Sequence, residues 1–361
     1  MLFTASTNDD TLYRALLERD GAYDGLAFVG VTSTRIFCRF TCPARKPKRQ
    51  HCRFFETAQA CVDAGFRPCK RCRPLLPEAA PDPVITALLE DLGRRPTHRW
   101  SEADIQALGF DLSTVRRAFK RQFGMTFLEL ARYRRLGDAI QTLGKGGKVI
   151  EAQIDARFES PSAFRSAVAR LLGLSPGDFV RNALLLVDWI DTPLGPMIVV
   201  GDRRSVHLLE FVDRKALATE LRGLRDRSNG SLGFGRPEPA DRIAEELSRF
   251  FAGEDAAFTT PLTLHGSPFA RQVWRALQEI PAGTTRSYGD LARAIGRPTA
   301  VRAVARANGA NQIALVIPCH RVIGADGSLT GYGGGLWRKQ RLIEIERSYR
   351  DRTDSRGAAS A

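Results

Sequence analysis

The feature that most restricts the fold of this chain is a set of cysteines near its N-terminus. Cys38 and Cys42 in "CRFTC" are separated by 26 residues from Cys69 and Cys72 in "CKRC". Six of the seven cysteines lie between residues 38 and 72, and an odd number crowded into one segment is not a disulfide framework. Four thiolates at this spacing are typical of a tetrahedral zinc site. The sequence therefore predicts a small zinc-binding domain with these four ligands.

A redox dithiol is the alternative interpretation of each cysteine pair. The strand-then-helix setting of such dithiols is missing, and "FRPCKRCRP" predicts a proline-bounded knuckle instead. Cys52 and Cys61 have no matched partners in the pattern, so we expect them to be ordinary small side chains.

Charge indicates the class of partner. The 361 residues include 54 Lys and Arg against 40 Asp and Glu, a net charge of +14, which favours nucleic acid over an anionic membrane surface. Seven basic residues and no acidic one lie between Arg35 and Arg53, and Arg45 and Lys46 are expected to contact phosphates there. A merely solvated face is the plainer alternative. No apolar run approaches the roughly 18 residues of a membrane span, so we expect a soluble, cytoplasmic protein.

The next segment, 81–179, predicts two helix-turn-helix units. In the first, Val115, Phe119 and Phe123 form one apolar stripe, and in the second Ser160 and Gly173 mark the start and end of a helix. A basic outer face, as on a helix lying in a major groove, is expected from Arg116, Arg117, Lys120 and Arg121.

After Leu184 the apolar residues occur in short runs typical of strands instead of at helical spacing. The runs "LLLVDWI", "GPMIVVG" and "SVHLLEFV" predict a small antiparallel sheet, followed by helices near 214–225 and 240–251. Trp189 and His207 are expected to be packing residues, so this unit is interpreted as scaffold. Beyond it, "SYGDLARAIGRP" and "TAVRAVARANG" predict one more helix-turn-helix, with Ser287 as an N-cap.

The seventh cysteine stands alone in "ALVIPCHRV". A buried structural role for Cys319 must explain why His320 and Arg321, two side chains that are costly to bury, follow it directly. A cysteine hydrolase is disfavoured, because neighbours in an extended segment point to opposite sides and cannot make the direct contact required. The interpretation that remains is a nucleophilic thiolate whose proton passes to a base without direct contact between the two side chains.

Three parts of the chain resemble known protein families. The tandem helical units, closing in "GMTFLEL" and "GLSPGDF", resemble the DNA-binding domain of AraC-type regulators. The chain departs at Arg157, where that family commonly has glycine before Phe158, so the turn of the second unit is expected to be strained or shifted.

From about Pro268 to Glu346 the chain resembles O6-alkylguanine-DNA alkyltransferases, whose signature is "IPCHRV". The resemblance implies that Cys319 takes the alkyl group from O6 of a guanine flipped out of the duplex. It also implies that His320 deprotonates Cys319 through a bound water and that Glu346 orients the imidazole.

The same resemblance implies roles for residues of the pocket. Tyr288 would donate to the departing guanine, Arg302 would fill the gap left in the stack, and Asn311 would fix the turn before the cysteine. Tyr332 and Gly331–Gly335 would form the pocket rim. The all-glycine run after Tyr332 departs from relatives that have a hydroxyl or larger residue there.

The segments "FVGVTSTRIFCRFTCPARKPKRQ" and "AGFRPCKRC" resemble the zinc domain of Ada-type adaptive-response proteins, and with the other two resemblances they cover nearly the whole chain. Cys38 would then accept a methyl group from a DNA methyl phosphotriester, since zinc keeps a thiolate deprotonated without a general base. Zinc with four thiolates has a formal charge of 2 − 4 = −2, and methylation of one sulfur leaves −1. We therefore expect methylation of Cys38 to strengthen DNA binding and to activate repair genes.

The fold class expected is multidomain α/β plus α. Its predicted parts are a zinc-binding α/β domain (1–78), an AraC-type tandem helix-turn-helix (81–181), a small ribonuclease-H-like α/β scaffold (184–264), a winged-helix-like alkyltransferase domain (266–347) and a disordered tail (348–361).

The expected partners are alkylated double-stranded DNA, promoter DNA and RNA polymerase, in the bacterial cytosol at the nucleoid and without a membrane. Zinc is the one cofactor expected. Two alternatives are a repair methyltransferase that has lost promoter activation, and a zinc-containing regulator with an inactive C-terminal module. The second predicts loss of the thiol at position 319, where Cys319 is present.

Overall fold

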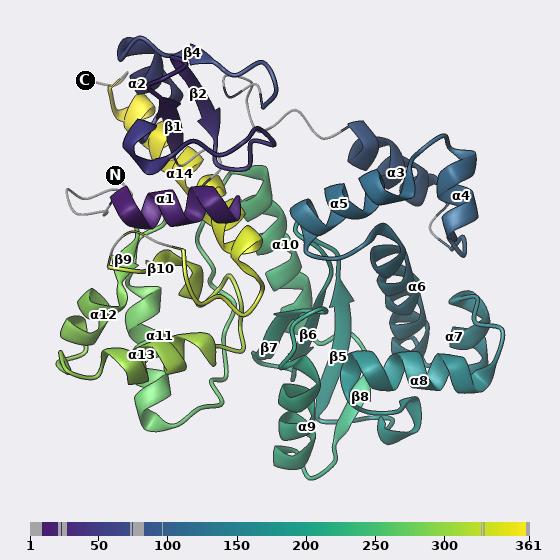
Figure 1. The fold of residues 1–361 in the computed structure, drawn as a ribbon. Coiled ribbons are helices and arrows are strands. Elements are labelled where there is room, and N and C mark those ends of the chain that lie inside the picture. The colour runs from purple at the N-terminus through teal and green to yellow at the C-terminus, as the bar shows by residue number, and fades with distance from the viewer. Residues whose placement is uncertain are drawn as a thin grey trace. The chain divides into compact units, whose positions relative to one another are not determined.

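The chain divides into two compact units, which are described separately. The computed structural model describes residues 9–20, 23, 27–72, 74, 83–95, 97–325, 327 and 329–358. One unit comprises Met1–Thr86 with Ile323–Thr330, and the other comprises Ala87–Val322 with Gly331–Ala361. Figure 1 traces the elements from purple at the N-terminus to yellow at the C-terminus. Within the described ranges, no helix combines the length and the apolar character needed to cross a membrane.

The first unit is built on a four-stranded sheet in the order β3-β1-β2-β4. Its strands are β1 (Phe28–Val31), β2 (Ile36–Arg39), β3 (Cys52–Phe55) and β4 (Arg67–Pro68), with helices α1 (Asp9–Glu18) and α2 (Ala58–Asp63) and the 3-10 turn η2 (Arg49–His51). β1 pairs antiparallel with β2 and β3, and β4 pairs parallel with β2. Phe28, Phe37, Cys61 and Phe66 form one buried apolar cluster of this unit. Further buried apolar side chains, among them Leu16 on α1 and Phe40, add to its core.

The second unit begins with helices whose ends follow local chemistry. They are α3 (Pro83–Arg94), α4 (Glu102–Ala107), α5 (Leu112–Phe123), α6 (Phe127–Gly144), α7 (Val149–Asp155) and α8 (Pro161–Leu172), with the 3-10 turn η3 (Pro176–Asp178). The Ser160 hydroxyl accepts from the N–H of Ala163 at the start of α8, and Gly173 ends it in the left-handed conformation. The predicted start and end of this helix are therefore confirmed.

Arg157 adopts a conformation that favours glycine. It follows α7 with φ of +52°, the left-handed region in which a side chain is strained. The guanidinium of Arg135 donates to the carbonyl of Ala156 at 3.0 Å and lies over the ring of Phe158, its carbon 5.4 Å from the centroid. The strain expected from the sequence is present, and Arg135 holds the turn in place.

A second four-stranded sheet follows, in the order β7-β6-β5-β8. Its elements are β5 (Leu185–Ile190), β6 (Met197–Gly201), β7 (Val206–Phe211), β8 (Leu232–Phe234), α9 (Leu217–Arg227) and α10 (Glu238–Ala252). β5, β6 and β7 are antiparallel as predicted, but β8 pairs parallel with β5, so a purely antiparallel sheet was wrong. Three residues give too little alternation to mark β8 in the sequence.

The last elements surround Cys319. They are α11 (Pro268–Gln278), β9 (Arg286–Ser287), α12 (Tyr288–Ala294), α13 (Val301–Gly309), the 3-10 turn η4 (Cys319–Arg321), β10 (Val322–Ile323) and α14 (Leu336–Ala358). The predicted N-cap Ser287 is confirmed, since its hydroxyl accepts from the N–H of Asp290. α14 extends to Ala358, whereas the sequence predicted disorder from residue 348. Adding residues to a formed helix avoids the cost of nucleation, which explains the difference.

Candidate functional site

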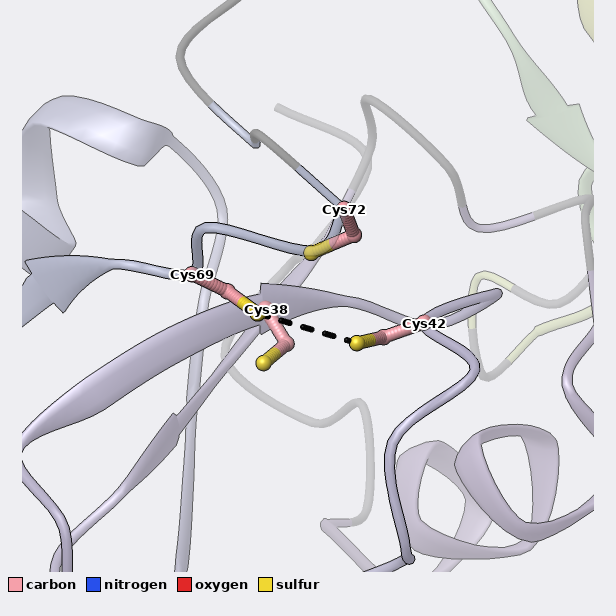
Figure 2. Close-up of side chains that lie close together, drawn as sticks. All are labelled: Cys38, Cys42, Cys69 and Cys72. Atoms are coloured by element: carbon pink, nitrogen blue, oxygen red, sulfur yellow. Dashed lines mark hydrogen bonds between the residues drawn. The ribbon is translucent and has the colours of Figure 1, made fainter.

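Four sulfur atoms converge in the first unit. The sulfurs of Cys38, Cys42, Cys69 and Cys72 all lie within 4.8 Å of one another, and Figure 2 shows these side chains gathered around one point. Cys38 is on β2, and Cys69 follows β4, the strand that pairs parallel with β2. This pairing brings the two halves of the sequence pattern together. Cys52 and Cys61, also buried, are outside the cluster.

The chemistry of this cluster fits a divalent cation. Hydrogen bonds with Cys42 and Cys72, together with burial, raise the pKa of Cys38, because several thiolates in contact repel one another. A soft divalent cation removes that repulsion, and four cysteine sulfurs are the donor set that Zn²⁺ prefers. The geometry therefore suits zinc.

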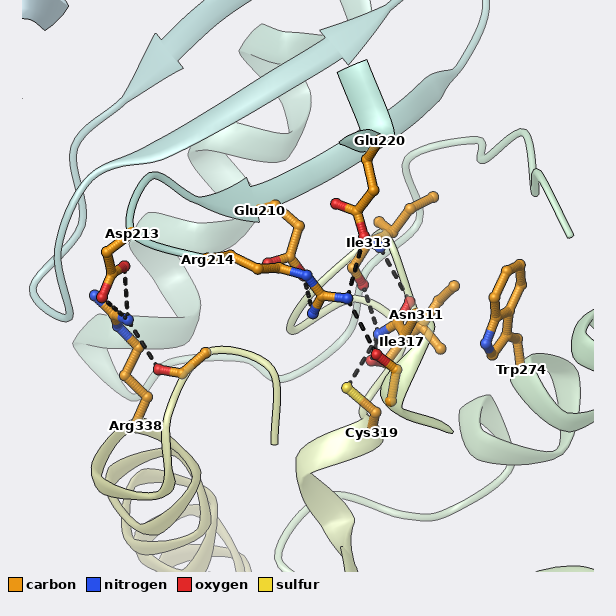
Figure 3. Close-up of polar contacts among 12 residues, drawn as sticks. Glu210, Asp213, Arg214, Glu220, Trp274, Asn311, Ile313, Ile317, Cys319 and Arg338 are labelled. Carbon is orange, nitrogen blue, oxygen red and sulfur yellow. Dashed lines mark hydrogen bonds and ion pairs between the residues drawn. The ribbon is translucent and has the colours of Figure 1, made fainter. Parts of the chain in front are cut away.

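Cys319 is a buried thiol held by an asparagine. Its exposed fraction is 4%, and the Asn311 amide donates to its Sγ at 3.1 Å and to the carbonyl of Ile317 at 2.9 Å. The Oδ1 atom of Asn311 accepts from the N–H of Ile313, so one side chain fixes the turn that precedes the cysteine (Figure 3). Burial raises the pKa of Cys319, and the hydrogen bond from Asn311 opposes that rise.

His320 and Glu346 form a buried pair beside this thiol. The Nε2 atom of His320 lies 2.9 Å from Oε1 of Glu346, and both side chains are fully buried. Nδ1 of His320 is buried without a hydrogen-bond partner among the residues that the structure describes, so it is the nitrogen with a lone pair available to take a proton. Arg321 donates to both oxygens of Glu346, and the N–H of Gly283 donates to Oε2. Glu346 therefore orients two side chains and one loop.

Matches to known families cover three separate parts of the chain. Residues 11–74 match the metal binding domain of Ada, residues 105–182 match a helix-turn-helix domain, and residues 268–348 match the DNA binding domain of 6-O-methylguanine DNA methyltransferase. The regulatory protein ada of Salmonella typhimurium is 36% identical over 96% of this chain and 99% of its own length. The chain belongs to the Ada family.

Two further relatives show how much of the chain the similarity covers. The bifunctional transcriptional activator/DNA repair enzyme Ada of Escherichia coli is 34% identical over 95% of this chain and 98% of its own length. The methylated-DNA–protein-cysteine methyltransferase of Mycobacterium bovis is 44% identical over 44% of this chain and 90% of its own length. Full-length members of the Ada family thus share the whole order of parts.

The basic residues predicted to contact DNA are placed in different ways in this Ada-family chain. Arg45 is exposed, whereas the Lys46 ammonium donates to the carbonyl of Phe40 at 2.7 Å and so supports the loop around Cys42. Arg302 is exposed near the start of α13.

Arg116, Arg117 and Lys120 of α5 are exposed, and two of them lie near a glutamate, whereas the side chain of Arg121 is outside the described part of the structure. Arg116 lies 3.5 Å from Glu102, and Lys120 lies 3.4 Å from Glu129. The Nε atom of Arg117 donates to the carbonyl of Ser113 on its own helix. Exposed pairs of this kind are worth at most about 1 kcal/mol, so phosphates can displace them.

The pocket residues of the Ada-family site come from separate elements. Tyr288 is the first residue of α12, and its hydroxyl donates to the carbonyl of Gly331 at 3.4 Å. The hydroxyl of Tyr332 is buried, with no hydrogen-bond partner in the described part of the chain. Lys339, which the sequence analysis did not single out, is buried and donates to the carbonyl of Val322. Burial lowers the pKa of Lys339 to about 8, and the nearby Cys319 thiolate opposes that shift.

A buried ion cluster near the thiol was not predicted. Arg214 donates to Glu210 and to Glu220, each at 3.1 Å, and to the carbonyl of Gly309 (Figure 3). The two glutamates are 1% and 8% exposed, and burial raises the pKa of Glu210 to about 8. The only sequence signal was a charged residue at the fifth position of the buried strand β7.

Proposed function

We propose that this chain is a DNA repair protein that transfers methyl groups irreversibly onto two of its own cysteines and regulates transcription. The observation that carries the proposal is the buried thiol of Cys319 beside the His320–Glu346 pair. Membership of the Ada family supports both the repair and the regulatory role. The thiol and the sulfur cluster are each consumed once, because a thioether has no easy route back to a thiolate.

The repair of O6-methylguanine uses Cys319 as the nucleophile. Glu346 accepts a hydrogen bond from the Nε2–H of His320 and fixes this tautomer. Nδ1 can then take the proton of the Cys319 thiol through a water. The sulfur forms a bond to the methyl carbon, the bond from that carbon to O6 breaks, and the electron pair goes to the guanine. Tyr288 stabilises the negative charge that develops there. The guanine anion then takes up the proton held by His320, delivered through solvent, so the products are S-methylcysteine, neutral His320 and unmodified guanine.

The target base must leave the duplex to reach this thiol. Arg302 fills the gap in the stack, and Asn311 keeps the thiol and its turn in place. Tyr332 and the glycines beside it form the rim of the pocket. The packing of α12 against α13 supports a winged-helix-like docking of this helix pair on DNA.

The phosphotriester repair uses Cys38. Zinc bound by Cys38, Cys42, Cys69 and Cys72 would keep these sulfurs deprotonated at neutral pH. The Cys38 sulfur bonds to the methyl carbon, the carbon–oxygen bond breaks, and an ordinary phosphodiester anion leaves. Arg45 and Lys46 hold the DNA backbone near this sulfur.

Methylation of Cys38 converts the chain into an activator of alkylation-repair genes. The formal charge of the metal site changes from −2 to −1, so the site repels DNA phosphates less. The methylated chain then binds promoter DNA through the exposed face of α5, with Arg116, Arg117 and Lys120, and recruits RNA polymerase at the nucleoid. The sheet order β7-β6-β5-β8, with β8 parallel to β5, supports a ribonuclease-H-like scaffold between the two DNA-binding parts.

One experiment tests both methyl transfers. The zinc-loaded chain is incubated with DNA carrying radiolabelled methyl groups, and the label is mapped to peptides. We expect label on Cys319 and Cys38, loss of one site each in Cys319→Ala and Cys38→Ala, and unchanged uptake in Cys52→Ala. Full uptake by both single variants would contradict the proposal.

A repair protein without promoter activation is the second candidate. The strained turn at Arg157, with φ of +52°, lies just before α8 of the second helix-turn-helix unit and favours this candidate. A footprint of the methylated chain on a repair-gene promoter decides between them, since the second candidate takes up methyl groups and leaves no footprint.

A further inference from the structure

A chain of hydrogen bonds lies at one end of the scaffold sheet, in a unit that the sequence analysis interpreted as inert. Nε2 of His207 lies 3.1 Å from Oδ2 of Asp202, and Nδ1 of His207 lies 2.9 Å from Nε2 of His265. Asp202 follows β6, His207 is on β7, and His265 comes 58 residues after His207. His207 is therefore more than a packing residue.

The protons of this chain follow from its partners. Oδ1 of Asp202 accepts from the N–H groups of Arg204 and Ser205, which lower the pKa of Asp202 against the effect of burial and keep it ionised. An ionised carboxylate only accepts, so His207 donates from Nε2 and accepts at Nδ1. His265 must then donate from Nε2. Its Nδ1 has no partner among the described residues and presents a lone pair.

The two histidines line a pocket that also contains four arginines, two acidic residues and an apolar stretch around Leu184–Leu186. The pocket has a volume of about 1050 Å³, and its charged lining residues are Asp202, Arg203, Arg204, Arg227, Arg236 and Glu238. Arg236 pairs with Asp188 and Asp241, but Arg203, Arg204 and Arg227 form no ion pair with any residue that the structure describes. The carboxylate of Asp202 is already satisfied by the backbone and by His207. Three arginines without an ion pair therefore line the pocket against one further carboxylate, that of Glu238, and the balance of charge is positive.

We propose that this pocket binds a phosphate ester group and that His265 takes up a proton when the phosphate binds. Guanidinium groups match phosphate oxygens in charge and geometry. Without ligand, burial, His207 and Arg227 lower the pKa of His265 to about 4, so its Nδ1 is unprotonated and keeps its lone pair. An anion placed beside Arg227 offsets the unfavourable charge and turns Nδ1 into a donor. A metal ion is disfavoured because both nitrogens of His207 already have hydrogen-bond partners.

Calorimetry with inorganic phosphate tests this proposal on the zinc-loaded full chain. Titrations near pH 6 in two buffers of different ionisation enthalpy measure both affinity and proton uptake. We expect binding with proton uptake in the parent chain, and affinity at least about fivefold weaker in Arg227→Gln and in Arg203→Gln/Arg204→Gln, a loss near 1 kcal/mol. His265→Gln should still bind but lose the proton uptake. Arg222→Gln is the matched control, since Arg222 is exposed on the same helix and outside the pocket.

The source of the phosphate is distinguished by replacing the ligand. A mononucleotide and a short unmodified duplex are titrated while the imidazole signals of His207 and His265 are followed by NMR. Shifts with the duplex assign the pocket to the DNA backbone, and shifts with the mononucleotide alone assign it to a free phosphate ester. Equal phosphate affinity in Arg227→Gln and Arg222→Gln would overturn the proposal. So would histidine signals that respond to Zn²⁺ and not to phosphate.

Discussion

The guanidinium of Arg214 occupies the space in which a side chain at residue 333 would begin. A Cβ atom built on Gly333 would lie 2.0 Å from the Nη1 atom of Arg214. Glu210, Glu220 and the carbonyl of Gly309 hold that guanidinium from its other sides, so it cannot simply move away. This contact gives a physical reason for glycine directly after Tyr332.

A double-mutant cycle measures this contact. We expect Gly333→Ser to slow O6-methylguanine repair by about tenfold and to cost about 1–3 kcal/mol of stability, as overpacking does. In an Arg214→Ala background the same substitution should cost at least about 1 kcal/mol less, because the blocking group is gone. Unfolding and single-turnover repair are measured for all four proteins. An equal cost of Gly333→Ser in both backgrounds would show that Arg214 does not limit residue 333.

Loss of one metal ligand should separate the two repair reactions. Cys69→Ala removes one of the four converging sulfurs, so we expect zinc content and uptake from methyl phosphotriesters to fall to background. Uptake by Cys319 from O6-methylguanine should remain within about twofold of the parent, since its proton acceptor needs no metal. Metal analysis and two singly modified oligonucleotides provide the measurement. Cys52→Ala, a buried cysteine outside the cluster, should behave as the parent.

Acid should destabilise the Cys319 site through His320 and Glu346. His320 and Arg321 lower the pKa of Glu346 to about 2 although burial opposes this, and burial lowers the pKa of His320. The unfolded chain therefore binds protons at His320 below about pH 6.5 and at Glu346 below about pH 4.5, where the folded chain does not. Stability from both groups is present at pH 7 and is lost as the pH falls toward 3.

Protection of the Cys319 thiol from a thiol reagent, followed in urea, checks this pH dependence. We expect the midpoint for exposure of Cys319 to fall steadily between pH 7 and pH 4. Glu346→Gln should be less stable at pH 7 and should show a shallower dependence on pH below about 4.5. A slope identical to that of the parent would exclude Glu346 as the titrating group.

Replacing Arg157 by glycine should stabilise the helical region. At φ of +52°, glycine avoids the strain of a side chain, and we expect a gain of about 1 kcal/mol. Gly109→Ala provides the reverse control, because Gly109 has φ of +83° with open space around it and the loss should be purely conformational. Thermal unfolding of both variants checks the two signs, and destabilisation by Arg157→Gly would show that the arginine makes contacts worth more than the strain.

Local signals were sufficient for much of this molecule. The spacing of Cys38, Cys42, Cys69 and Cys72 predicted their convergence, and Ser160, Gly173 and Ser287 were placed correctly because caps act within one helical turn. Relationships between distant segments were not predictable in this way.

Two groups illustrate that limit. His207 and His265 are 58 residues apart, and Arg214 reaches Gly309 across 95 residues, so no window of sequence contains either contact. β8 was missed because it is three residues long and is defined by its partner β5. Pairing across a sheet and burial of ions depend on the tertiary fold, which periodicity does not describe.

The position of Glu346 ties the reactivity of Cys319 to a distant helix. This carboxylate receives hydrogen bonds from His320, Arg321 and Gly283, and it lies on α14, 26 residues after His320. When that helix is undocked, the imidazole has no orienting acceptor and the sulfur has no relay for its proton. Undocking of α14 therefore makes Cys319 unreactive without any change to the cysteine itself.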